Sequence, residues 1–309
     1  MKKLIPVLLI ACFIYFLVFP ADLMQSVANG LTIWYRNILP SMLPFAFLST
    51  LILESGTFYT LNKILAPLLR CFFPALENGY FPFVTGFFFG FPFGSKITAD
   101  LTAAKKLPLR EGNLICSISN NVSPAFTINI VQQALFLHFA PTAVTLFLLY
   151  FPPLLIGWLY HRKIFGRRTA AESKKAAPRF QFNFKIIDAA IMNAFETMLK
   201  LCGYIVLFAV ICNILENLFS SHTILTAIGM NLFEISNGAV SLKDLPLPVE
   251  IKYLIMLPAL SFGGISCLCQ SVSMMKPGNL SVGYYVKFKL LTAVMTFLLT
   301  FLYLTIFHR

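Results

Sequence analysis

Acidic residues are scarce in this sequence, with 12 Asp and Glu against 24 Lys and Arg among 309 residues. Charged residues of both signs make up only 12% of the chain, whereas hydrophobic residues make up 58% and the mean hydropathy is +0.79. This composition leaves too little polar surface to cover a water-soluble globule of this length. The sequence therefore predicts an all-α polytopic membrane protein.

Signatures of catalysis and of metal binding are also missing. The chain has no phosphate-binding glycine loop followed by Lys and Ser or Thr, no zinc-protease helix motif, and only four His, which lie near predicted membrane ends or in loops. Its seven cysteines, an odd number scattered mostly through apolar segments, do not form a disulfide framework. We therefore expect no enzyme, no metal site and no cofactor.

The excess of positive charge, +12 at pH 7, is densest in residues 161–185. Because this basic block lies between apolar segments, it is typical of a cytoplasmic loop that fixes membrane topology, and it requires no nucleic-acid partner. Helically spaced apolar residues over 184–198 predict a helix along the membrane interface. We expect residues 161–198 to join two halves of the chain as a basic cytoplasmic linker with an interfacial helix.

Apolar windows mark the candidate membrane segments. Lys2 and Lys3 precede an apolar run over 4–20 that lacks a small-x-small cleavage site, so residues 1–35 are expected to hold an uncleaved span and an external loop. The other windows are residues 38–53, 81–101, 114–137, 143–160, 199–218, 224–240, 251–275 and 290–307.

The window over 81–101 has basic residues on both sides, with Lys63 and Arg70 before it and Lys105 and Lys106 after it. Both ends are therefore expected on the cytoplasmic side, which a single crossing does not allow. Helix breakers accumulate in its middle, at Gly86, Gly90, Pro92 and Gly94. We interpret the window as a re-entrant hairpin that turns near residues 90–94.

The second half of the chain mirrors the first. The window over 224–240 is predicted to be a hairpin entered from outside, because residues 241–250 carry one Lys against Asp244 and Glu250. Residues 36–160 and 199–309 then each hold a span, a hairpin and two further spans, in opposite orientations. Such an inverted repeat places a solute site at the membrane midplane, where the interrupted helices meet.

Four short motifs follow one another over roughly residues 40–300. They are Gly90–Ile97, Ser119–Phe126, Phe233–Gly238 and Ser261–Ser266 with Gln270. Through them the chain resembles the YlbJ-like sporulation integral membrane proteins of spore-forming Firmicutes (stage V sporulation protein SpoVV), which carry a nucleoside recognition or Gate domain. The resemblance implies a fold distantly similar to concentrative nucleoside transporters. It also implies movement of dipicolinic acid into the forespore.

A dianion such as dipicolinate requires oriented donors and a compensating cation in a low-dielectric site. Lys96, just past the break at Gly94, is the candidate cation, and pairing with Asp100 one turn on is the alternative. The amides of Asn120 and Asn121 are expected to contact solute or a coupling ion, or else to bond neighbouring helices. Gly263 and Gly264 either unwind their helix locally or let it pack closely against a neighbour. The candidate solute-binding residues are Gly94, Ser95, Lys96, Asn120, Asn121, Ser123, Asn237, Gly263, Gly264, Ser266 and Gln270.

Glu234 is an ionisable residue within the apolar second hairpin. A carboxylate repels an anionic solute, so Glu234 is expected to couple transport to a proton or cation, or to pair with Lys96 in the empty state. An exposed position at the base of the hairpin is the alternative.

The sequence thus favours a non-enzymatic transporter of a small organic anion in the cell membrane or outer forespore membrane. Transport of a nucleoside or other metabolite is one alternative, and a non-transporting Gate-domain scaffold of a sporulation membrane complex is another. The expected partners are the solute and the lipid bilayer, with a homo-oligomer left open.

Overall fold

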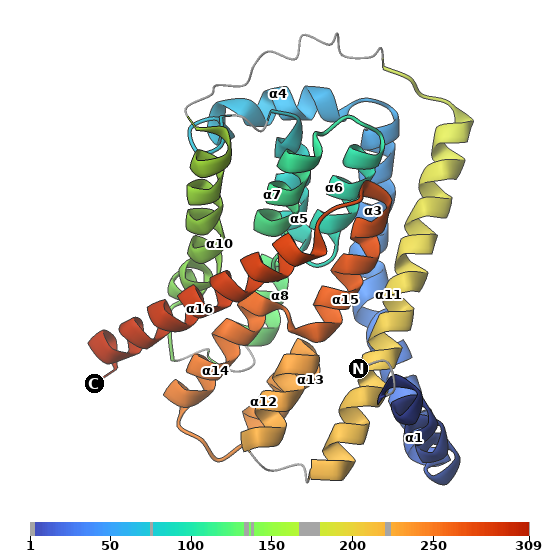
Figure 1. The fold of residues 1–309 in the computed structure, drawn as a ribbon, viewed down its shortest axis with the longest axis vertical. Helices are drawn as coiled ribbons and strands as arrows, with labels where there is room; N and C mark the ends of the chain where they lie inside the picture. The colour runs from blue at the N-terminus through green and yellow to red at the C-terminus, as the bar shows by residue number, and fades with distance from the viewer. Residues whose placement is uncertain are drawn as a thin grey trace.

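The computed structural model describes residues 4–74, 77–132, 136, 139–166, 180–219 and 224–308. The described chain is helical throughout and has no strand within those ranges (Figure 1). Five of its helical segments are long and apolar enough to cross a membrane: Pro20–Glu54, Thr142–Phe165, Phe184–Asn217, Val249–Gly278 and Val282–Phe307. The predicted class of all-α polytopic membrane protein is confirmed.

The N-terminal part is more helical than expected. Helix α1 (Leu4–Val18) is followed by α2 (Pro20–Ile33), η1 (Trp34–Ile38) and α3 (Leu39–Glu54). The last three form one segment of 35 residues. Residues 20–35 are therefore helix where an external loop was predicted, because Pro20 occupies the first turn of α2, where its missing N–H is not needed.

A helical hairpin occupies the first half of the chain. Helix α4 (Phe58–Leu69) lies across one end of the molecule, and η2 (Glu77–Gly79) leads into α5 (Tyr80–Phe89) and α6 (Phe93–Ala103) (Figure 1). Gly90, with φ +79°, ends α5 and begins the break, which matches the predicted turn near residues 90–94. Whether this hairpin is re-entrant stays a prediction at this point.

The segment predicted as one span over 114–137 is interrupted. Helix α7 (Leu109–Ser119) ends where Asn120 leaves the helical region at φ −88° and ψ 79°. The short α8 (Pro124–Phe126) and the π-helix η3 (Thr127–Gln132) follow, and residues 133–135 and 137 lie outside the described part. Pro124 has no N–H to continue the α7 ladder, which explains the break.

The helix predicted at the end of the linker is the start of a longer one. Helix α10 (Thr142–Phe165) ends the first half, and residues 167–179 of the predicted linker lie outside the described chain. Residues 184–198, expected to form an interfacial helix, instead begin the 36-residue helix α11 (Phe184–Phe219), which packs against α2 and α3. Residues 184–200 still carry charged side chains such as Lys185, Asp188 and Glu196, and the apolar character becomes continuous only after Lys200. No Pro interrupts the segment, and packing against α2 and α3 supports one long helix.

The second half contains another hairpin and another interrupted helix. Helices α12 (Ile224–Phe233) and α13 (Ile235–Asp244) pack together on either side of Glu234. Helices α14 (Val249–Phe262) and α15 (Gly264–Met275) are separated at Gly263, which has φ +92°, and η4 (Lys276–Gly278) follows. Helix α16 (Val282–Phe307) then begins eight residues before the predicted span over 290–307.

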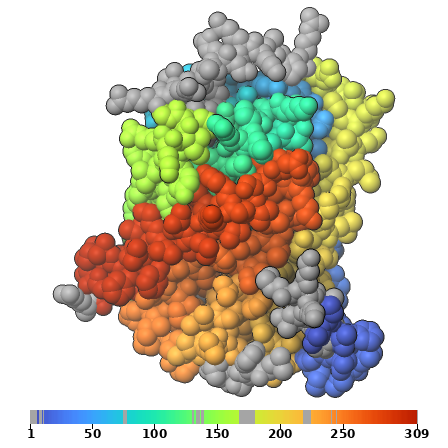
Figure 2. Space-filling view, viewed as in Figure 1, coloured from blue at the N-terminus to red at the C-terminus, as the bar shows by residue number. Residues whose placement is uncertain are grey.

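Helix α16 has its apolar side outward and its polar side inward. Leu290, Val294 and Phe297 are exposed, whereas Lys289 and three threonines (Thr292, Thr296, Thr300) are fully buried. Figure 2 shows the segments α14 to α16, orange to red, crossing this face of the molecule. An apolar exterior around a polar interior is the arrangement that suits a helix in contact with lipid.

Candidate solute-binding site

A central cavity of about 110 Å³ lies where the second hairpin, the first helix break and α15 come together. Four predicted site residues line it: Ser123, Glu234, Asn237 and Gln270. The remaining wall is mostly apolar and comes from α3, α11 and the tip of the first hairpin. Residues more than 140 positions apart in the sequence therefore line one cavity.

Glu234 is at the tip of the second hairpin, and the alternative of an exposed position at its base is wrong. It caps α13, where its two carboxylate oxygens accept from the backbone N–H groups of Ser236 (3.1 Å) and Asn237 (2.7 Å). The N-terminus of a helix stabilises a negative charge, so α13 holds this carboxylate in an otherwise apolar hairpin. Asn237 is thereby fixed at the cavity by its backbone.

The tip of the first hairpin is bonded to the first helix break. The backbone N–H of Phe91 donates to the carbonyl oxygen of Asn121 at 2.9 Å. The ring of Phe91 reaches the other break, because a Cβ at Gly263 would lie 2.6 Å from Phe91 Cζ. Glycine is required at position 263 for two reasons: the positive φ and the close approach of the Phe91 ring. Phe91 thus joins the two interrupted helices.

Asn120 connects the two halves of the chain. Its Nδ2 donates to Ser271 Oγ on α15 at 2.6 Å and to Tyr285 OH on α16 at 2.7 Å. The side chain is completely buried, and its Oδ1 has no hydrogen-bond partner among the described residues. This contact supports the reading of Asn120 as a bond between helices, and it leaves one acceptor open beside the break.

Lys289, on the inner face of α16, is a buried basic residue that is not among the predicted site residues. Its Nζ donates to Asn121 Oδ1 at 2.8 Å and lies over the ring of Phe91, 4.8 Å from the centroid. The side chain has no solvent exposure, and no carboxylate forms an ion pair with it in the described part of the chain. Burying a lysine with only a neutral amide and an aromatic ring costs free energy of folding, so its presence here indicates a function.

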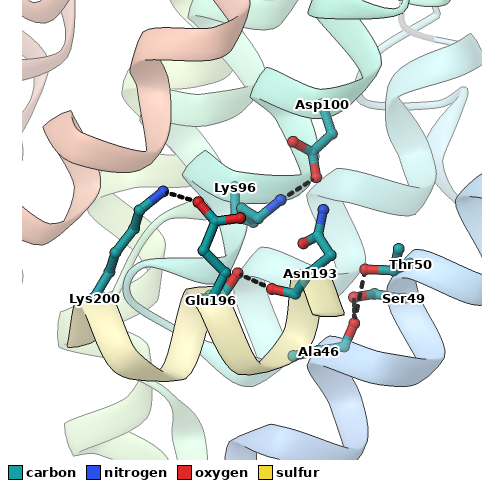
Figure 3. Close-up of polar contacts among 9 residues, drawn as sticks. Ala46, Ser49, Thr50, Lys96, Asp100, Asn193, Glu196 and Lys200 are labelled. Atoms are coloured by element: carbon teal, nitrogen blue, oxygen red, sulfur yellow. Dashed lines mark hydrogen bonds and ion pairs between the residues drawn. The ribbon is translucent and has the colours of Figure 1, made fainter. Parts of the chain in front are cut away.

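Lys96 lies on another side of the first hairpin. Its Nζ is 2.5 Å from Asp100 Oδ2, the pairing that the one-turn spacing offered as the alternative. Figure 3 shows it pointing toward Asp100, between α6 and α11, above Ser49 and Thr50 of α3. A separate small cavity of about 10 Å³ lies there, so the structure does not bring Lys96 to the central cavity.

The other predicted site residues surround the breaks without lining the cavity. Gly94 and Ser95 begin α6, where Ser95 Oγ is 3.3 Å from Cys116 Sγ. Gly264 follows Gly263 with φ +67°, next to the backbone of α12. Ser266 is buried and accepts from Gln270 Nε2 at 3.1 Å, which orients that amide at the cavity.

A comparison with known proteins places this geometry in context. The chain is 27% identical over 270 residues to the sporulation integral membrane protein YlbJ of Bacillus subtilis (strain 168). The chain is therefore similar to an integral membrane protein of sporulation. The match covers 80% of this chain and 64% of the Bacillus protein, so the chain spans less than two thirds of that relative's length. No protein-family model and no solved structure matches the chain.

This likeness and the five apolar helices agree on a multi-pass location in a membrane. The polar groups inside these helices, above all Lys289, therefore lie within segments that are suited to a lipid surrounding. One sequence signal could have identified Lys289. It shares a helical face with Thr292, Thr296 and Thr300, at spacings of three, four and four, while apolar residues occupy the opposite face. A polar stripe of this kind indicates an inward-facing lysine.

Proposed function

We propose that this chain carries a small organic anion across a membrane, without enzymatic chemistry, and that Lys289 supplies the compensating charge. The observation that carries the proposal is a fully buried lysine side chain, in contact with neutral groups, beside the first helix break and the Phe91 ring. An ionisable residue inside a membrane protein marks a solute or ion route by default. Lys96 is a poorer candidate, because Asp100 already neutralises it.

An inverted repeat gives this site its expected place at the membrane midplane. Each half has a long helix, a hairpin, an interrupted helix and a further long helix, and Figure 1 shows the two hairpins approaching from opposite ends. Helices α5 and α12 have 10 residues each, or about 15 Å, which is half of a hydrocarbon core of about 30 Å. Hairpins of this length reach the middle of the bilayer from either side.

Single-cysteine labelling tests this topology. Cysteines at the exposed positions Thr60, Ala104 and Lys243 flank the two hairpins. We expect a membrane-impermeant maleimide to modify positions 60 and 104 from one side of the membrane and position 243 only from the other. Labelling of positions 60 and 104 from opposite sides would show that the first hairpin crosses the bilayer, and the repeat would be wrong.

Dipicolinic acid is the proposed solute because of the resemblance to YlbJ-like proteins, whose Bacillus member is named for sporulation. The outer forespore membrane is accordingly the proposed location. Dipicolinate has two carboxylates on a flat ring, and one carboxylate would pair with Lys289 while Asn and Gln amides contact the remainder. Transport would use an ion gradient, with Glu234 as the coupling group, because Glu234 is an ionisable residue that lines the cavity.

A nucleoside is the second candidate solute, and a specific feature of the cavity favours it. Glu234 is the charged residue among the described cavity-lining residues, and its carboxylate can accept from ribose hydroxyls without repelling a neutral solute. In this case Lys289 would stay behind Phe91 and serve the fold. The two candidates predict opposite results for the same uptake measurement.

Uptake of labelled dipicolinate and of uridine into proteoliposomes, under an imposed proton or sodium gradient, tests the proposal. We expect dipicolinate to enter faster when one gradient is applied, and we expect Glu234→Gln to remove that gradient dependence. Uridine uptake alone would establish the nucleoside carrier. Uptake of neither solute under either gradient would contradict the proposed function and support a scaffold.

A further inference from the structure

The ring of Phe91 separates the central cavity from the ammonium group of Lys289. Phe91 belongs to the cavity wall, whereas Lys289 does not. The face of the same ring meets Lys289 Nζ at 4.8 Å from its centroid. A solute in the cavity therefore meets the aromatic ring of Phe91, and Lys289 lies behind that ring.

The groups behind the ring are suited to an anion. Lys289 has three N–H donors, and Asn121 Oδ1 accepts one of them. The Phe91 ring occupies a second side of the Lys289 amino group through a cation–π contact. A carboxylate carries a full charge and would bind there more strongly than the ring in a desolvated site. Asn121 Nδ2 is held by the Ile118 carbonyl oxygen at 2.6 Å, so this amide is oriented before any solute arrives.

The backbone of Phe91 is fixed, and its ring is the part that can move. The Phe91 N–H is bonded to Asn121 O, and the N–H of Gly90 is bonded to Gly86 O. The ring packs against Gly263, which has no side chain to hold it on that side. A change of the Phe91 side-chain rotamer would open a direct route from the cavity to Lys289 without unfolding the hairpin.

We infer that the Phe91 ring occupies a carboxylate-binding subsite formed by Lys289 and Asn121, and that an entering carboxylate displaces the ring. This inference rests on the proposed function for the nature of the solute. The shielding of position 289 by Phe91 requires no solute at all, so the two can be tested separately.

Chemical labelling tests the shielding. In the full chain with Lys289→Cys, a small thiosulfonate should modify position 289 slowly, because the Phe91 ring covers it. Adding Phe91→Ala removes that cover and should raise the rate by about tenfold or more, which corresponds to about 1.4 kcal/mol. Peptide mass spectrometry assigns the modified site, so the native cysteines are kept. Phe91→Leu keeps a large side chain at the cavity wall, so it still covers position 289. Its labelling rate should stay within about twofold of that of the Lys289→Cys parent.

A control position separates local opening from general loosening. Thr300 is fully buried on the same helix, two turns or more beyond Lys289, and Thr300→Cys should stay protected with or without Phe91→Ala. Equal labelling of position 289 with Phe or Ala at position 91 would overturn the inference. So would equal acceleration at positions 289 and 300.

Calorimetric titration of the purified chain tests the preference for a carboxylate. Phe91→Ala, with Lys289 intact, should bind dipicolinate about tenfold more tightly than the parent, since the ring no longer competes. It should not change the affinity for pyridine-2,6-dicarboxamide, which has the same shape without charge.

Equal changes for the two compounds would overturn the carboxylate subsite even if the ring shields Lys289. Absence of dipicolinate binding to the parent and to Phe91→Ala would also overturn it. Faster labelling with no dipicolinate uptake would instead point to failure of the proposed function.

Discussion

Replacing Lys289 with Met should abolish most anion uptake while leaving the protein as stable as before, or more stable. The substitution removes a charge-assisted contact to the solute, worth about 1.5–3 kcal/mol, which corresponds to a loss of roughly 10- to 150-fold in uptake at low solute concentration. It also removes an ammonium group that is buried with only neutral partners, and replacing such a group by an apolar side chain of similar size is often neutral or stabilising. Uptake into proteoliposomes and thermal unfolding in detergent measure the two effects.

Lys287→Met is the matched control, because Lys287 is exposed and lies two residues earlier on the same helix. Its uptake should stay within about twofold of the parent, as for a surface charge. Lys96→Met, the change that the sequence alone would select, should affect uptake less than Lys289→Met. Normal uptake in Lys289→Met, or a large fall in its unfolding temperature, would show that Lys289 serves the fold and not the solute.

Gly86→Ala should disrupt the first hairpin and lower the unfolding temperature of the whole protein. A Cβ at Gly86 would lie 2.5 Å from Gly94 Cα and 2.8 Å from Ser119 Oγ. The nearest atom belongs to the backbone, so α5 and α6 must separate to accept one methyl group, at a cost of about 1–3 kcal/mol for an overpacked interior. Thermal unfolding of the purified protein, followed by tryptophan fluorescence or light scattering, measures the change.

Gly203→Ala provides the comparison for that substitution. Gly203 is an exposed residue within α11, and a Cβ there would meet nothing within 4 Å. Removing a glycine from a helix interior is favourable by about 0.5–1 kcal/mol, so this variant should be as stable as the parent or slightly more so. If both variants unfold at the same temperature as the parent, the close contact between the arms of the hairpin is not present in the membrane.

Local chemistry made much of the fold predictable. Gly90, Pro92 and Gly94 indicated where the first hairpin turns, and Gly263 indicated the break between α14 and α15, because each residue has a specific effect on the helical backbone. The cavity also brings Ser123, Asn237 and Gln270, three of the eleven candidate solute-binding residues, together with the candidate coupling residue Glu234. Burial of polar groups inside an apolar chain carries this information.

The remaining features depend on contacts between distant residues. Composition and charge give the same weight to Lys96 and Lys289, and only the structure shows that Asp100 neutralises the first while Asn121 and Phe91 surround the second. Residues 184–198 could form an interfacial helix or the start of a longer one, and packing of α11 on α2 and α3 decides between them. The sequence does not distinguish Phe91 from the other Phe residues, of which there are 33 in total, because its role comes from one hydrogen bond and one close contact between distant residues.

The lengths of two helical segments that pack together have a mechanical consequence. Helix α11 has 36 residues and the segment Pro20–Glu54 has 35, so each is more than 50 Å long at about 1.5 Å per residue. Both exceed a hydrocarbon core of about 30 Å, and each must tilt or project into water at its ends. A thinner or thicker bilayer would then change the tilt of this pair, and with it the cavity wall that α3 and α11 provide. The activity of the proposed carrier should therefore depend on lipid chain length, and the membrane itself would then act as a regulator.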